Sequence, residues 1–306
     1  MNLKLQVEMR DAYFETLSSL ALENPDAVIL TADHGAFGLK KFEELRVGQF
    51  INCGIAEQNM VSVAAGLALE GKKVFVYGIS PFLSLRALEQ ITIDVSLHDA
   101  DVTLVSVGAG FTYATDGPTH HGLQELGVVL TVPDLKIINC SSPSTSRFAA
   151  RESFEKGGPL YVRVEKGLAE EDDLSLGDMS KGFVLRHEGT SKTVLVTTGL
   201  IPQNVVDLAL TKDVTLVDWF SINSSDVDVV VEYLCSFDKI VCVEEGYELG
   251  LSAVLARVLM RKKWIGSGGF HSVSAPHKFV CLYGTRDYLR EVTGLGLHDI
   301  EAAIDE

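Results

Sequence analysis

The residue with the clearest chemical potential in this sequence is a single carboxylate, Glu57. It follows a short apolar run that ends in Asn52-Cys53-Gly54, and it precedes an apolar helical face that includes Val61 and Ala65. This pattern predicts that Glu57 lies where a strand gives way to a helix, close to the first helical turn. An acid at that place can simply interact with the positive end of the helix dipole. It can also be a partly buried catalytic carboxylate that exchanges or shares a proton with a ligand.

A second candidate site is the long loop at residues 108–122, which contains Asp-Gly-Pro-Thr-His-His-Gly at 116–122. The loop follows a β-branched strand predicted over Val102–Val107, and ligands of open α/β sheets bind at the carboxyl ends of such strands. The proline of the motif stiffens the turn and would hold His120 in place. Adjacent side chains such as His120 and His121 point in different directions, so they do not predict a zinc site. A surface turn with incidental histidines is the alternative.

Two further pairs of residues could bind ligands. Phe82 and Arg86 have helical i, i+4 spacing within a helix predicted over Pro81–Leu97, so they could form an aromatic wall for a ring-bearing cofactor. A core aromatic with a surface arginine would give the same pattern. Arg163 and Lys166 come at the end of an apolar strand and could capture a phosphate group, or could be solvated charges.

The elements that must position these residues alternate between strand and helix. This alternation predicts a mostly parallel sheet that is covered on both faces. The segments predicted for the first half are a helix over Val7–Asn24, strands over Ala27–Leu30, Lys73–Tyr77, Val102–Val107, Lys136–Asn139 and Leu160–Val164, and helices over Pro81–Leu97 and Pro143–Phe154.

A change in composition separates the two halves of the chain. Residues 170–180 are acidic with little apolar periodicity, and a small hairpin or bend is predicted over Gly182–Gly189. The α/β pattern then restarts at Thr193 and continues to a helix over Leu249–Met260. The glycine-rich stretch at 266–269 precedes no helix and carries no lysine, which indicates a turn and not a phosphate loop.

Composition excludes several classes of function. The chain has 306 residues, 46% of them hydrophobic and 22% charged, and a net charge of −16, which argues against nucleic acid or an anionic membrane surface as the main partner. A local basic pocket could still bind a phosphorylated substrate. The five cysteines have no C-x-x-C spacing, which fits reduced thiols in a cytoplasmic protein. The sequence also lacks a P-loop, a Rossmann glycine motif and a G-x-S-x-G elbow.

Three of these segments together resemble the thiamine-diphosphate enzymes of the transketolase group. They are Gly-Ile-Ala-Glu-Gln-Asn-Met at 54–60, the motif at 116–122, and Phe82 followed by Arg-Ala-Leu-Glu-Gln at 86–90. The resemblance implies an α/β fold with two doubly wound, mostly parallel-sheet domains. We expect a pyrimidine-binding domain at 1–167, a linker at 168–191 and a smaller transketolase C-terminal domain at 192–306.

The resemblance implies a set of cofactor-binding residues. Glu57 would act catalytically, by hydrogen-bonding the pyrimidine ring of thiamine diphosphate and favouring its imino tautomer. Phe82 would stack on that ring, with Ile55 and Arg86 beside it. Asp33 matches an acidic residue near the cofactor.

The resemblance also implies a substrate side. Asp116 would contact substrate hydroxyls, while catalytic His120, Lys166 and Arg163 would contact a phosphate or the distal hydroxyls. The sequence departs from the family at Gly108, where many transketolases carry a histidine that contacts the donor ketose. We therefore expect the donor or acceptor sugar to differ from the common pentose phosphates, as in a biosynthetic transketolase acting on a modified sugar.

The family's diphosphate-binding motif, Gly-Asp-Gly followed by Asn, is absent from the sequence. The chain starts where the domain with that motif would end. We therefore expect the C-terminal subunit of a split transketolase, with Mg²⁺ and the diphosphate held by a separate N-terminal subunit in a heterotetramer. The alternatives are a deoxyxylulose-phosphate-synthase-like subunit, a 2-oxoacid dehydrogenase E1 β-like subunit, and a non-catalytic subunit that keeps the fold.

Overall fold

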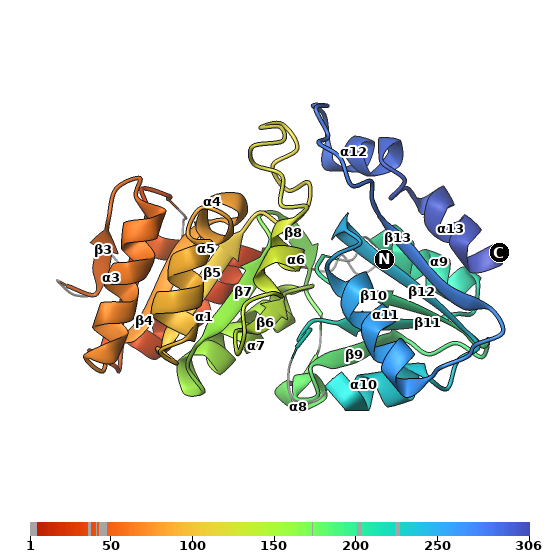
Figure 1. Ribbon diagram of the computed structural model, residues 1–306, viewed down its shortest axis with the longest axis horizontal. Coiled ribbons are helices and arrows are strands. Elements are labelled where there is room, and N and C mark those ends of the chain that lie inside the picture. The colour runs from red at the N-terminus through yellow and green to blue at the C-terminus, as the bar shows by residue number, and fades with distance from the viewer. Residues whose placement is uncertain are drawn as a thin grey trace.

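Two sheets with flanking helices lie side by side in the computed structural model (Figure 1). The structure describes residues 5–35, 38–40, 42, 48–172, 174–200, 203–223 and 227–306. Among these residues, no helix is long and apolar enough to cross a membrane.

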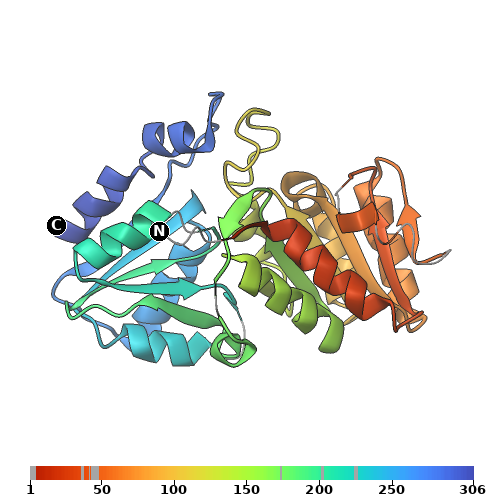
Figure 2. The same ribbon diagram turned by 180° about the vertical axis from the view of Figure 1, so that it is seen from behind.

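The first sheet consists of parallel strands in the order β3-β2-β4-β5-β7-β6. Alternate residues of each strand face opposite sides. Val28 and Leu30 of β2 belong to the apolar cluster that includes α3, while Ala27 and Ile29 belong to the cluster that includes α1. Both faces are therefore covered, as Figure 2 shows from the side of α1 and α7. The strand bounds are β2 Ala27–Thr31, β3 Phe50–Asn52, β4 Lys73–Ile79, β5 Val102–Val107, β6 Lys136–Asn139 and β7 Leu160–Val164.

The second sheet has the order β13-β12-β10-β11-β9, in which only β9 is antiparallel to its neighbour among the described strands. This mixed sheet and the parallel first sheet confirm the predicted α/β class. The bounds are β9 Phe183–His187, β10 Thr193–Thr197, β11 Thr215–Trp219, β12 Lys239–Tyr247 and β13 Gly269–Ala275.

The helices pack against these two sheets. Their bounds are α1 Met9–Ala21, α3 Glu57–Leu69, α4 Ser80–Ser84, α5 Leu88–Gln90, the π-helix η1 Ile91–Ser96, α6 Glu125–Val129, α7 Pro143–Glu155, α8 Leu176–Met179, α9 Gln203–Thr211, α10 Val227–Leu234, α11 Leu251–Lys262, α12 Arg286–Val292 and α13 Leu297–Asp305.

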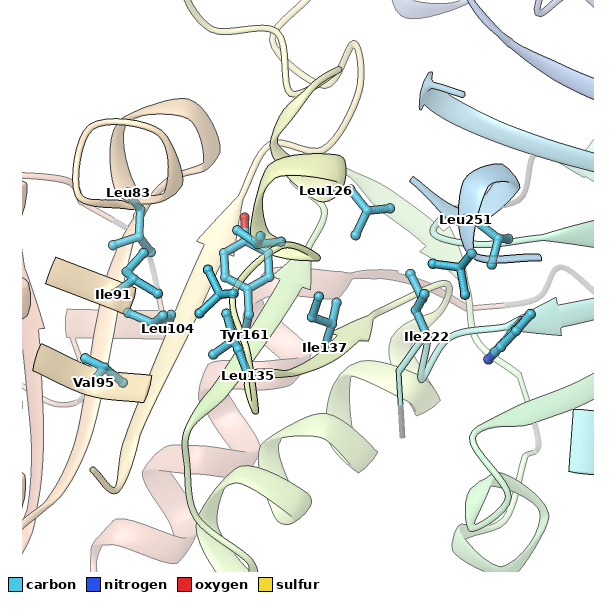
Figure 3. Packing of buried hydrophobic residues seen from close by; sticks show 14 of the residues in the cluster. Leu83, Ile91, Val95, Leu104, Leu126, Leu135, Ile137, Tyr161, Ile222 and Leu251 are labelled. Carbon is cyan, nitrogen blue, oxygen red and sulfur yellow. The ribbon is translucent and has the colours of Figure 1, made fainter. Parts of the chain in front are cut away.

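One apolar cluster extends from the first sheet into the second. Figure 3 shows Leu126 and Ile137 of the first half close to Ile222 and Leu251 of the second. The two halves therefore share an apolar interface, and they hold each other in a fixed arrangement.

The single helix predicted over Pro81–Leu97 is wrong. The segment is broken into α4, α5 and η1, with a turn at 85–87. The Ser84 hydroxyl donates to the Ser80 carbonyl at 2.6 Å, and the Thr92 hydroxyl donates to the Leu88 carbonyl at 2.8 Å. Such bonds to the carbonyl four residues back compete with the regular ladder and bend helices.

The segment expected as a linker contains regular structure. Strand β8 (Leu168–Glu170) pairs antiparallel with β1 (Gln6–Glu8), and β9 joins the second sheet as an edge strand in place of the predicted small hairpin or bend. The domain division remains a proposal, and the pairing of β9 with β11 would place residues 183–187 in the second domain.

Candidate active site

Glu57 is the first residue of α3, as the sequence predicts, and its side chain is 1% exposed. Its Oε2 accepts a hydrogen bond from Arg86 Nη1 at 2.6 Å. Its Oε1 is buried and has no hydrogen-bond partner among the residues that the structure describes. Because buried polar atoms are nearly always paired, this oxygen is a natural acceptor for a donor on a ligand.

Phe82 and Arg86 do lie together, although the helix between them ends at Ser84. The guanidinium carbon of Arg86 is 4.7 Å from the centroid of the Phe82 ring. The turn that follows α4 lets Arg86 reach Glu57 from the protein surface, where its side chain is 43% exposed. The pair therefore forms an aromatic wall beside the buried carboxylate.

Sequence reasoning missed His34, which stacks on Phe82 with ring centroids 6.2 Å apart. Burial lowers the pKa of His34, while the Glu57 and Asp33 carboxylates act in the opposite direction. Its Nδ1 is buried without a hydrogen-bond partner in the described part of the chain. His34 is thus a second unpaired polar group next to the same aromatic ring.

The substrate loop, which we define as residues 108–122, brings His120 to this wall. The His120 ring meets the Phe82 ring edge-on with centroids 5.0 Å apart, and Thr119 Oγ1 lies 3.0 Å from His120 Nδ1. Tyr113 follows at 5.9 Å from the His120 ring, and the Lys166 ammonium lies 5.4 Å from the centroid of the Tyr113 ring. Phe82, His120, Tyr113 and Lys166 therefore form one continuous surface.

Tyr113 is a second residue that sequence reasoning missed. A Cβ placed on Gly108, whose φ is +99°, would lie 2.4 Å from Tyr113 Cε2. The phenol ring therefore occupies the space that a side chain at position 108 would need. Burial raises the pKa of Tyr113, so its hydroxyl stays a hydrogen-bond donor at neutral pH.

Three other residues expected in the site, Asp33, Asp116 and Ile55, are exposed. Asp33 is exposed in a left-handed conformation (φ +59°), and Asn52 holds it with two hydrogen bonds of 3.1 Å. Asp116 is exposed on the substrate loop beside Thr115. Ile55 is 77% exposed.

Arg163 does not face a substrate pocket as expected, because its side chain points into the protein interior. Its side chain is 4% exposed, its Nε is 2.6 Å from Glu125 Oε1, and its Nη2 donates to the Gly122 carbonyl at 2.9 Å. The expected contact with a substrate phosphate does not fit these bonds. Arg163 instead anchors the end of the substrate loop.

These residues fit the aminopyrimidine ring of thiamine diphosphate. The unpaired Oε1 of Glu57 supplies a buried acceptor, and Phe82 supplies an aromatic surface for a planar ring. Among the residues that the structure describes, no group of three or more His, Cys, Asp or Glu side chains could hold a metal ion.

Comparison with known proteins gives the same family. The model of the family "Transketolase, pyrimidine binding domain" matches residues 6–171. The chain is 30% identical, over 83% of its length and 84% of the relative's, to an apulose-4-phosphate transketolase subunit of Phocaeicola vulgatus. It is 32% identical, over 86% of its length, to the 1-deoxy-D-xylulose-5-phosphate synthase of Thermotoga petrophila, of which it covers 44%.

A solved structure agrees over nearly the whole chain. It is described as "Split gene transketolase, inactive beta4 tetramer" and superposes with a TM-score of 0.83 at 25% identity, covering 98% of this chain and 97% of that one. The chain belongs to the transketolase family, as a transketolase-type subunit of a transferase family that depends on thiamine diphosphate.

Proposed function

We propose that this chain is the C-terminal subunit of a split transketolase that transfers a two-carbon ketol unit from an anionic ketose to an aldose. The observation that carries the proposal is the buried Glu57 carboxylate, with one oxygen on Arg86 and the other without a partner in the described part of the chain. A carboxylate that served only the helix dipole would be expected at the surface, where water solvates it.

Glu57 would hold the pyrimidine ring of thiamine diphosphate, with Phe82 as the wall behind it. The cofactor, when bound, supplies the carbon nucleophile that accepts the ketol unit. Arg86 fixes Oε2, so Oε1 is the atom that would share a proton with a ring nitrogen. The low exposure of Glu57 keeps water from competing for that proton.

The substrate side would be formed by His120, Tyr113 and Lys166. No carboxylate of the described residues forms an ion pair with Lys166, whose ammonium lies over the Tyr113 ring. His120 lies between Tyr113 and Phe82, so it would face the reacting end of a sugar. A phosphate or another anionic group could then bind at Lys166, with Asp116 available to sugar hydroxyls on the rim.

We propose that a partner chain supplies the ligands for Mg²⁺ and the diphosphate. Two observations support this: the Phocaeicola relative is named as one subunit of a transketolase, and this sequence lacks a Gly-Asp-Gly motif. The test is ketol transfer by the purified chain with thiamine diphosphate and Mg²⁺, with and without a chain that carries Gly-Asp-Gly…Asn. We expect no turnover by the chain alone. Robust activity of the chain alone would refute the proposal that a partner supplies these ligands.

A second candidate is a synthase of the deoxyxylulose-phosphate kind, because the chain is 32% identical to such an enzyme. A synthase reaction would consume pyruvate and release CO₂, whereas a transketolase would cleave a ketose without decarboxylation. Assaying the assembled enzyme for CO₂ from pyruvate and for aldose release from ketose phosphates separates the two reactions.

A further inference from the structure

The second domain holds the substrate loop through its own core. Phe111 and Ala114 of the loop, and Leu123 directly after it, are buried in an apolar cluster. Its other members come from the second domain, among them Val241 and Val273. In Figures 1 and 2 the loop rises from the first domain beside the segment that leads into α12. The loop that carries His120 is thus packed by a domain that contributes none of the expected cofactor-binding residues.

Hydrogen bonds from β12 fix both ends of this loop. The Phe111 amide donates to Glu245 Oε1 at 2.6 Å, and the Tyr247 amide donates to the Leu123 carbonyl at 2.7 Å. A Cβ on Gly110 would lie 2.5 Å from Glu245 Oε1, so the contact requires glycine there. The substrate loop therefore packs tightly against the end of β12.

Arg286 joins Glu245 to a second carboxylate that supports the loop, Glu165. Its Nε donates to Glu245 Oε1 at 2.8 Å, and its Nη1 and Nη2 each donate to Glu165 at 3.1 Å. Glu165 in turn accepts from the hydroxyl of Thr112 in the loop. Glu165 also directly precedes Lys166, so one guanidinium fixes the supports of both the loop and the lysine.

We propose that Arg286 is a positioning residue, through which the second domain sets the substrate loop and Lys166 for sugar binding. This rests on the proposed function of the site. The Arg286 side chain is 17% exposed and its guanidinium is bonded to Glu165 and Glu245, so it acts through these two carboxylates and not on the substrate. Removing it would take both guanidinium hydrogen bonds from Glu165 and leave Glu245 with Arg290 alone. The Phe111 amide would then have a less firmly held acceptor.

Hydrogen exchange on the purified chain directly tests whether Arg286 holds the substrate loop. In Arg286→Ala we expect the amides of residues 110–122 to exchange about tenfold faster or more, because their opening free energy falls. The amides of β10 and β11 should keep the exchange of the unaltered protein. Unchanged exchange of the loop with these strands intact would overturn the proposal.

Arg186→Ala is the matched control. Arg186 is another largely buried arginine between two carboxylates, with Nη1 2.6 Å from Asp172 Oδ2 and Nη2 2.7 Å from Asp218 Oδ2. It contacts Ser141 and not the substrate loop. Its loss should leave exchange at 110–122 unchanged. Equal loosening of the loop in both variants would mean that any lost interdomain charge suffices, which would also overturn the proposal.

Arg286→Lys covers the case in which the alanine variant fails to fold. Lysine keeps the charge but cannot bridge both glutamates with a planar fork, so loop exchange should be intermediate. In the assembled enzyme, Arg286→Lys should raise the KM for the sugar more than it lowers kcat, and leave the affinity for thiamine diphosphate unchanged. An unchanged sugar KM would contradict positioning, whereas an enzyme complex without ketol transfer would contradict only the proposed function.

Discussion

Two arginine–glutamate pairs in the first domain have the same nitrogen–oxygen distance, 2.6 Å, but different surroundings. Arg163 and Glu125 are both almost fully buried, and Arg163 also donates to the Gly122 carbonyl. Each glutamate has one buried oxygen without a hydrogen-bond partner among the described residues. The pairs differ in the arginine, because Arg86 is 43% exposed whereas Arg163 is enclosed. A pair enclosed on both sides is part of the scaffold. A buried carboxylate whose cation reaches it from the surface has a side open to a ligand.

The largest effect should come from breaking the enclosed pair. Arg163→Met leaves Glu125 buried without its cation, which should cost about 3–5 kcal/mol of unfolding free energy. Arg86→Met, the matched change at the open pair, should cost less, because the arginine that it removes is 43% exposed and a solvated cation contributes less to stability. Urea denaturation of both variants measures this difference. Equal losses would remove the distinction between the two pairs.

Glu57→Gln should affect turnover strongly and stability little, the reverse of what is expected at the enclosed pair. The amide keeps the shape of the carboxylate but cannot share its proton, so turnover of the assembled enzyme should fall about 10²-fold or more. Its unfolding free energy should change little. Unchanged turnover would mean that Glu57 only serves the start of α3. Glu125→Gln is the control, and should affect stability more than turnover.

Tyr113 sharpens the comparison on the substrate side of the open pair. Tyr113→Phe keeps the ring over Gly108 and removes one hydroxyl, so the KM for the sugar should rise about two- to tenfold, the value of one hydrogen bond. Tyr113→Leu also opens the space above Gly108 and should broaden the range of ketose donors. Steady-state kinetics with a panel of ketose phosphates measures both effects. If Tyr113→Phe matches the unaltered enzyme for every donor, the hydroxyl does not contact the sugar.

The smallest effect concerns acid stability at the pair of Arg286 and Glu245 in the second domain. Burial alone would raise the pKa of Glu245, but Arg286 and Arg290 outweigh it and hold the pKa at about 2. This depressed pKa contributes stability that is present above the ordinary value of 4.5 and is lost as the pH falls toward 2. We expect Glu245→Gln to flatten the fall in unfolding free energy over this range. An unaltered acid profile would show that Glu245 carries no such charge interaction.

Local patterns in the sequence were enough to predict the frame of the site. The start of α3 at Glu57 and the strand before the substrate loop are confirmed, because short-range apolar periodicity determines both. His34 and Tyr113 were missed because their roles depend on ring contacts across the fold. Gly108 held a signal for Tyr113, since a missing side chain in a packed loop has to be replaced by another group.

The second domain was harder to predict where its contacts are distant in sequence. Arg286 pairs with Glu165, from which it is separated by 121 positions, and no local pattern links the two. The strand β13 and the helices α12 and α13 were not predicted, because they follow a glycine-rich turn and short, weakly periodic segments. Arg163 was misassigned because a charged residue at a strand end looks the same in sequence whether it faces solvent or a buried Glu125.

The apolar side chains that the substrate loop contributes to the second domain also bear on folding during synthesis. Phe111 and Ala114 leave the ribosome well before β12 and β13, against which their cluster packs. The first domain can form its sheet early, but its substrate loop has no core to enter until the last third of the chain is made. We therefore expect the loop to be the last part of the nascent first domain to become resistant to protease, because the competent site needs β12 and β13 in place.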